Sequence, residues 1–97
     1  MIFNESNVKV IREYGYLSKY VGKKAPYFPF TSNDLKNNVI ILIDSSYTSS
    51  RTFIQIAVDD NKAIFYSFYN DKYSELIFNF GTMEITRIIK PLNSGVV

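Results

Sequence analysis

The second half of the chain is a succession of strand-length segments separated by short polar turns. Residues 39–43 are wholly apolar, which is typical of a strand covered on both faces. Residues 51–58 and 75–80 alternate in character, and residues 63–69 and 83–89 are rich in aromatic or β-branched types. Because the connections between them are short, we predict five strands joined as an antiparallel meander.

The composition independently favours a β-rich fold. Of 97 residues, 40 are β-branched or aromatic, whereas three are Ala and five are Leu. The length allows a single domain, residues 1–97. With no cysteine and no histidine, the chain cannot build a disulfide framework or a thiolate or imidazole metal site. Its longest aliphatic run is far shorter than the roughly 20 residues of a membrane-spanning helix, so we expect no membrane partner.

Residues 6–21 fit two local patterns. Apolar or aromatic side chains recur there at helical spacing, at Val10, Tyr14, Leu17 and Val21. Part of the same segment also fits the period of two that is typical of a strand, and Gly15 costs a helix about 1 kcal/mol relative to Ala. We predict a helix, with a strand as the alternative, because the second face of the apolar run at residues 39–43 needs a cover.

The remaining N-terminal residues are predicted to be irregular except for one short helical turn at residues 31–36. Pro26 and Pro29 impose an extended path on the segment before that turn. The predicted fold is therefore a β-dominated α+β domain. It has a five-stranded antiparallel meander sheet, with an N-terminal helical or irregular segment packed on one face. A small β-barrel is the alternative.

The side chains most often used in catalysis are missing. Without histidine or cysteine, a mechanism would need a different base and nucleophile. Asp44 stands beside Ser45 and Ser46 after a predicted buried strand, but a polar loop explains this group. Residues 59–61 offer oxygen ligands and lack the glycine and distal glutamate of a calcium loop, so we predict a hairpin turn there. We expect no enzyme, no cofactor and no metal site.

Residues 14–30 interleave six aromatic side chains with three lysines. Single-stranded nucleic-acid binders combine rings that stack on bases with cations that contact phosphates. The net charge of +2 is small but permits such a role. As the alternative function, we therefore predict a single-stranded nucleic-acid-binding domain that uses Tyr16, Lys19, Tyr20, Lys23 and Lys24.

Large side chains occupy both faces of the predicted strand at residues 63–69, and one sheet in so short a chain cannot easily bury both faces. A proline-stiffened loop adds further aromatic side chains that have little entropy to lose on binding. Exposed aromatic residues on a rigid frame are typical of protein interfaces. We predict that a partner protein contacts Tyr27, Phe28, Phe30, Phe65 and Tyr69.

The leading functional hypothesis is thus a small, non-catalytic protein-binding module. Asn, Ile, Lys, Tyr and Phe, whose codons are AT-rich, total 45 of 97 residues, which favours an AT-rich genome. Short chains without motifs from such genomes often belong to viruses or mobile elements, so we expect an inhibitor that occupies a host protein's surface. Apolar strands left at a sheet edge would also pair with a second copy, as a homo-oligomer. With no export signal, the expected location is the cytoplasm.

Overall fold

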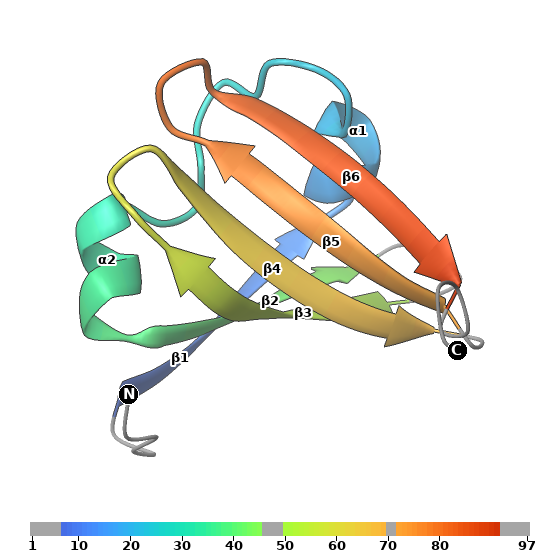
Figure 1. Cartoon of the computed structure of the whole chain (residues 1–97), viewed down its shortest axis with the longest axis horizontal. Helices are drawn as coiled ribbons and strands as arrows, with labels where there is room; N and C mark the ends of the chain where they lie inside the picture. Colours follow the sequence, from blue (N-terminus) through green and yellow to red (C-terminus); the bar gives the residue numbers. More distant parts are fainter. Residues whose placement is uncertain (1–6, 46–49, 70–71, 92–97) are drawn as a thin grey trace, which may run out of the picture.

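The computed structural model describes residues 7–45, 50–69 and 72–91. Within them it has six strands and two short helices (Figure 1): β1 Val8–Tyr14, α1 Tyr16–Tyr20, α2 Ser32–Asn37, β2 Val39–Ser45, β3 Ser50–Val58, β4 Lys62–Tyr69, β5 Lys72–Asn79 and β6 Glu84–Pro91. The strands form one open sheet in the order β1-β2-β3-β4-β5-β6. The pair β1 and β2 is parallel, and every other neighbouring pair is antiparallel. The predicted β-dominated α+β class is confirmed.

The first strand corrects the prediction of a helix over residues 6–21. β1 pairs with β2 along its whole length, from Val8 opposite Val39 to Tyr14 opposite Ser45, and this ladder takes up backbone groups that a helix would have paired internally. Gly15 then adopts a left-handed conformation with φ of 67°, which ends the strand and begins α1. The sheet therefore has six strands in the described residues, where five were predicted.

The connection from β1 to β2, residues 15–38, crosses one face of the sheet. After α1 it reaches the far edge, where Val21 and Lys24 form bridges with Ile85 and Glu84 of β6. The Gly22 amide donates to the Ile85 carbonyl over 2.7 Å. In Figure 1, α1 accordingly lies near β6, and α2 lies near the turn between β3 and β4. We call the side covered by this connection the inner face, and the opposite side the outer face.

The core lies between the connection and the inner face. Alternate residues of the strands meet buried side chains of the connection there, as the period of two requires. The buried set comprises Tyr16, Leu17, Ala25, Phe30, Leu35, Ile40, Leu42, Phe53, Ala63, Phe65, Leu76, Phe78 and Ile85. The ring of Phe30 lies 5.3 Å from that of Phe65 and 5.0 Å from that of Phe78, between centroids. Full burial of one such side chain contributes roughly 1.5–3 kcal/mol.

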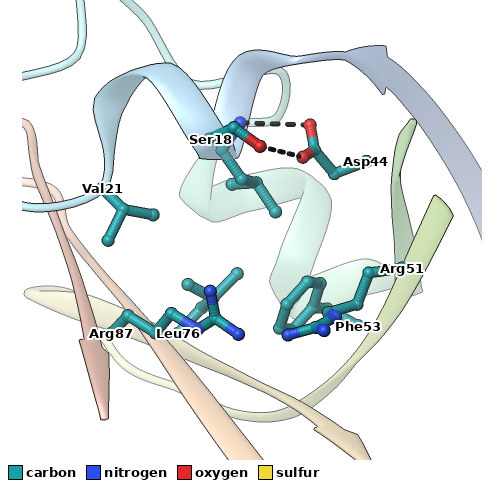
Figure 2. Close-up of a pocket in the computed structure, with 8 residues that line it drawn as sticks. Ser18, Val21, Asp44, Arg51, Phe53, Leu76 and Arg87 are labelled. Atoms are coloured by element: carbon teal, nitrogen blue, oxygen red, sulfur yellow. Dashed lines mark hydrogen bonds between the residues drawn. The ribbon is translucent and has the colours of Figure 1, made fainter. Parts of the chain in front are cut away.

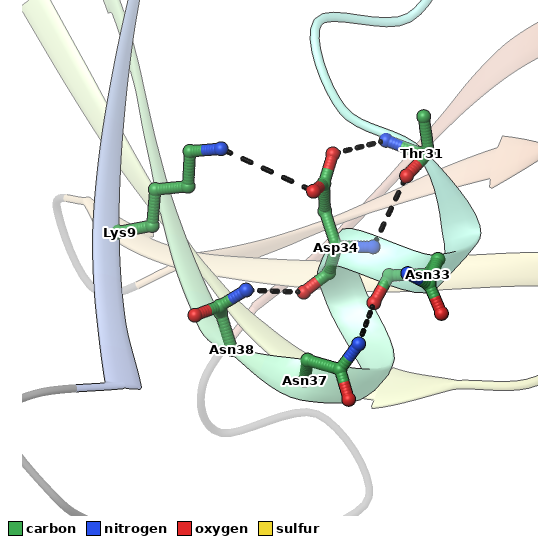
Figure 3. A network of polar contacts seen from close by, with 6 residues as sticks. All are labelled: Lys9, Thr31, Asn33, Asp34, Asn37 and Asn38. Carbon is green, nitrogen blue, oxygen red and sulfur yellow. Dashed lines mark hydrogen bonds and ion pairs between the residues drawn. The ribbon is translucent and has the colours of Figure 1, made fainter.

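The second helix begins with a capping box, which confirms the predicted helical turn (Figure 3). Thr31 Oγ1 accepts from the Asp34 amide at 3.1 Å, and Asp34 Oδ2 accepts from the Thr31 amide at 2.9 Å. Lys9 Nζ of β1 lies 4.0 Å from Asp34 Oδ1. The hydrogen bonds from Thr31 hold the pKa of Asp34 below its usual value, and the charge of Lys9 adds to this.

One polar side chain of β3 ties the second helix to the sheet. Gln55 Nε2 donates to the Leu35 carbonyl at 2.8 Å, and Gln55 Oε1 accepts from the Ile40 amide at 2.8 Å. A carbonyl near the end of α2 and an amide near the start of β2 are satisfied in this way. Leaving such groups unpaired inside the protein costs about 1–3 kcal/mol each.

The predicted turn at residues 59–61 is also confirmed. Asp59 Oδ1 accepts from the amides of Asn61 and Lys62, each at 2.8 Å. These bonds stabilise the ionised carboxylate and lower the pKa of Asp59. The side chain that sequence analysis weighed as a cation ligand is thus used to shape the hairpin between β3 and β4.

Candidate functional site

The outer face of the sheet carries large apolar side chains that nothing in the described part of the chain covers. Strand register aligns Val10, Ile41, Ile54 and Tyr66 in one row across four strands. Five side chains of this face, or of the bulge in β3, are between 46% and 63% exposed, namely Val10, Tyr14, Ile54, Ile56 and Phe68. Apolar exposure concentrated on one face is typical of an interaction surface.

Three aromatic rings form a cluster on this face, which we call the outer aromatic cluster. Phe68 stands perpendicular to Tyr66 with centroids 4.8 Å apart, and Tyr73 lies 5.2 Å from Tyr66 and 6.4 Å from Phe68. The ammonium group of Lys90 lies 5.9 Å from the centre of the Tyr73 ring. Because the rings already support one another, they have little side-chain entropy to lose when a partner covers them.

A groove of about 310 Å³ lies beside this cluster, between β3 and β4. The ladder between the two strands runs from Ile54 opposite Tyr66 to Val58 opposite Ala63. The first residues of β3 and the last residues of β4, all within the described part of the chain, have therefore separated. Three large side chains of the outer face line the groove together with four polar or charged residues: Ile54, Tyr66 and Phe68, and Ser50, Arg51, Thr52 and Ser67. The groove could therefore receive a side chain from a partner.

The structure places the five predicted partner contacts differently from one another. Tyr27 is about half exposed, and Phe28 is partly buried against the core. Phe30 and Phe65 are core residues. The side chain of Tyr69 lies outside the described residues.

On β4, the predicted contact Phe65 lies on the face that the connection covers, whereas Tyr66 and Phe68, which were not predicted, lie on the outer face. A usable signal was the small size of Ala63 and Ser67. They flank Phe65 on the inner face, where the connection must approach the strand closely.

The alternative, nucleic-acid set lies on the connection. Lys19, Lys23 and Lys24 are exposed, whereas Tyr20 is partly buried and packs against the core. Tyr16 is buried, with its ring 5.0 Å from Tyr20 and 5.1 Å from Tyr27, so a base could stack on it only after displacing these neighbours. Burial and the nearby Tyr27 raise the pKa of Tyr16 to about 12.

A pocket of about 480 Å³ opens between α1 and the inner face (Figure 2). Its lining combines four apolar side chains with four polar or charged ones: Leu17, Val21, Phe53 and Leu76, and Ser18, Asp44, Arg51 and Arg87. These residues come from α1 and the residue after it, and from β2, β3, β5 and β6. The pocket therefore exists because the connection brings α1 across the sheet.

Asp44 holds α1 in place over this pocket. Its Oδ1 accepts from the Leu17 amide at 3.1 Å, and its Oδ2 accepts from Ser18 Oγ at 3.4 Å. Gly15, at the N-cap position, has no side chain to offer, so Asp44 from β2 satisfies a donor of the first turn instead. Asp44, the catalytic candidate indicated by the sequence, therefore has a structural use. Ser46, which the sequence analysis considered together with Asp44, lies outside the described residues.

Two arginines from opposite parts of the sheet meet in the pocket. Figure 2 shows the guanidinium groups of Arg51 and Arg87 pointing toward each other below Ser18 and Asp44. Arg87 Nη2 donates to Ser74 Oγ at 3.4 Å. Burial and the positive charge of Arg51 lower the pKa of Arg87. With Asp44 as the carboxylate in the lining, the pocket holds two cations and one anion.

Comparison of the chain with protein-family models, with curated proteins and with solved structures gives no match. In the described ranges, neither helix has the length and apolar character needed to cross a membrane. Those ranges also contain no group of three or more acidic, histidine or cysteine side chains that could hold a metal ion.

Proposed function

We propose that this chain is a non-catalytic protein-binding module whose outer face docks on a partner protein. The observation that carries the proposal is the concentration of exposed aliphatic and aromatic side chains there, above all Ile54 and Phe68 beside the groove. Interfaces gain most of their affinity from a few such anchors that fill pockets and exclude water.

The chemistry of the outer face suggests what the partner presents. Glu75 continues the apolar row beyond Tyr66, and it lies opposite Tyr66 of β4 on one side and Ile88 of β6 on the other. Burying its carboxylate against a purely apolar surface would be costly, because an unpaired buried charge costs several kcal/mol. We therefore propose a partner with an apolar patch that carries one Lys or Arg, or another strong donor, opposite Glu75.

Occupation of a partner's surface needs no catalytic group, and this agrees with the use of Asp44 to hold α1. The biological setting that we propose is an inhibitor encoded by a virus or mobile element, acting on a host protein in the cytoplasm. The AT-rich codon bias of the composition supports that setting.

The test compares two variants that remove exposed apolar side chains from opposite faces of the sheet. Ile54→Ser with Phe68→Ser changes the outer face, and Ile89→Ser changes a residue that is 54% exposed but lies in register with Ser74 of the inner face. Tagged proteins are used to capture partners from host cells in high salt, after nuclease treatment, with quantification by mass spectrometry. We expect a stoichiometric partner with the wild type and with Ile89→Ser, and its loss with the double variant.

Three outcomes would contradict the proposal. First, the partner could be lost on nuclease treatment and also with the double variant Lys23→Ala and Lys24→Ala. This result would favour the nucleic-acid alternative. Capture that the double variant leaves unchanged would exclude the outer face. Sedimentation showing a dimer that only the double variant dissociates would identify a second copy of this chain as the occupant.

A further inference from the structure

We infer that the pocket between α1 and the inner face binds a small organic molecule carrying one oxyanion group, a phosphate or a carboxylate. This inference goes beyond the proposed function, because it concerns the opposite face of the sheet. The pocket's volume of about 480 Å³ lies within the range of small-molecule sites, about 300–1,000 Å³.

The first argument is the convergence of two guanidinium groups. Arg51 extends from β3 and Arg87 from β6, and both point into the same space (Figure 2). Two like charges directed at each other are unfavourable, and an oxyanion between them would replace this repulsion with two charge-assisted contacts. The planar guanidinium donates in a fork that matches the oxygens of a phosphate or carboxylate.

A hydrogen bond helps to orient one of the two cations, Arg87. Ser74, a buried residue of β5, accepts from Arg87 and helps to fix its direction. Among the described residues, Arg87 forms no ion pair. Its weakened hold on the proton, due to burial and to Arg51, agrees with a cation that lacks a compensating anion.

The remaining lining determines the rest of the ligand. Leu17, Val21, Phe53 and Leu76 supply apolar surface next to the arginines. A compact ring or a short aliphatic group on the ligand would pack there, since apolar walls with a few placed polar groups are typical of ligand sites. Asp44 also lines the pocket, so an anionic ligand would sit with its oxygens toward the arginines and away from this carboxylate.

The probes that test this inference are phenyl phosphate, benzoate and benzyl alcohol. They share a ring and differ in the anionic group, so the first two separate a phosphate from a carboxylate ligand and the third lacks charge. Binding is measured by NMR titration of backbone amides and by calorimetry at low salt. We expect at least one anion to bind, to shift the amides of Leu17, Ser18 and Leu76 rather than those of Tyr66 and Phe68, and to weaken as chloride is added.

Matched arginine variants identify the groups responsible. Arg51→Gln and Arg87→Gln should each weaken anion binding at least about tenfold, because each removes a charge-assisted contact. Arg12→Gln is the control, since Arg12 is exposed on the outer side of β1, in register with Ile43. Circular dichroism and thermal melting verify that each variant is folded.

Several results would overturn the inference. They are the absence of anion binding at millimolar concentration, equally tight binding of benzyl alcohol, shifts confined to the outer face, or equal loss of binding in Arg12→Gln. The amide shifts of the wild type decide the question even if an arginine variant does not fold. Failure here leaves the partner capture unaffected, because that assay reports on Ile54 and Phe68.

Discussion

Phe65 and Phe68 belong to the same strand, yet the first is 0% exposed and the second is 60% exposed. The difference arises from the connection between β1 and β2, which covers one face of the sheet and leaves the other open. Identical residue types therefore serve the core on one side and face solvent on the other. Whether an aromatic side chain on a strand belongs to the core can therefore be decided only when the face covered by the connection is known.

Polar groups are divided between the two faces in a related way. On the inner face, Asp44 and Gln55 bond backbone groups of the connection, and Arg51 and Arg87 line the pocket below α1. The apolar row of the outer face contains a single acidic side chain among the aligned described residues, Glu75. On the inner face, apolar packing and hydrogen bonds together hold the connection in place. The outer face, which is apolar and exposed, is suited to binding a partner protein.

The largest expected effect compares the two rings directly. Phe65→Ala should lower the free energy of unfolding by about 3–5 kcal/mol, because it empties a tightly packed site. Phe68→Ala should lower it by about 1 kcal/mol or less, since it removes ring contacts from an exposed cluster. Chemical denaturation of both variants measures the difference. Equal losses would mean that the outer face is already covered in the isolated protein, and the comparison of faces would be wrong.

The antiparallel meander could be predicted from the sequence because the strands that pair are close together in the chain. Residues 51–58 and 63–69 are neighbours in the chain, and the turn between them uses the side chain of Asp59 within the turn itself. The pairing of β1 with β2 is different, since the whole connection separates them and no local pattern reports a parallel partner. This explains why residues 8–14 were predicted as a helix.

The candidate sites were harder to predict for the same reason. An alternating strand has two faces, and alternation alone cannot say which face the connection will cover. The pocket was not foreseen either, because Arg51 and Arg87 come from strands that lie three places apart in the sheet. The two arginines line a pocket only because α1 lies across the sheet above them. No pattern of residue spacing in the sequence predicts where α1 lies.

A smaller effect tests how the cover is attached near α1. Asp44→Asn should lower the free energy of unfolding by about 1–3 kcal/mol, because the buried carboxylate accepts from Leu17 and Ser18. Asp60→Asn, which affects an exposed ion pair with Lys36, is the control and should change it by about 0.5 kcal/mol or less. An unchanged stability would show that Asp44 does not hold the cover.

The smallest effect concerns the other end of the cover, at α2. The capping box keeps the pKa of Asp34 below its ordinary value of 3.8, so ionised Asp34 contributes stability that is complete above that value. The contribution is lost as the pH falls through the lower pKa of the folded state, where the carboxylate takes up a proton. Asp34→Asn should therefore be less stable than the wild type at neutral pH, and the gap should narrow below about pH 4. Urea denaturation across that range measures the gap.

Asp59, whose pKa is lowered by the turn between β3 and β4, provides the comparison. Asp59→Asn should show the same pH dependence, and the two effects on the free energy of unfolding should add because the residues share no partner. A gap for Asp34→Asn that stays constant with pH would mean that the carboxylate does not stabilise the start of α2.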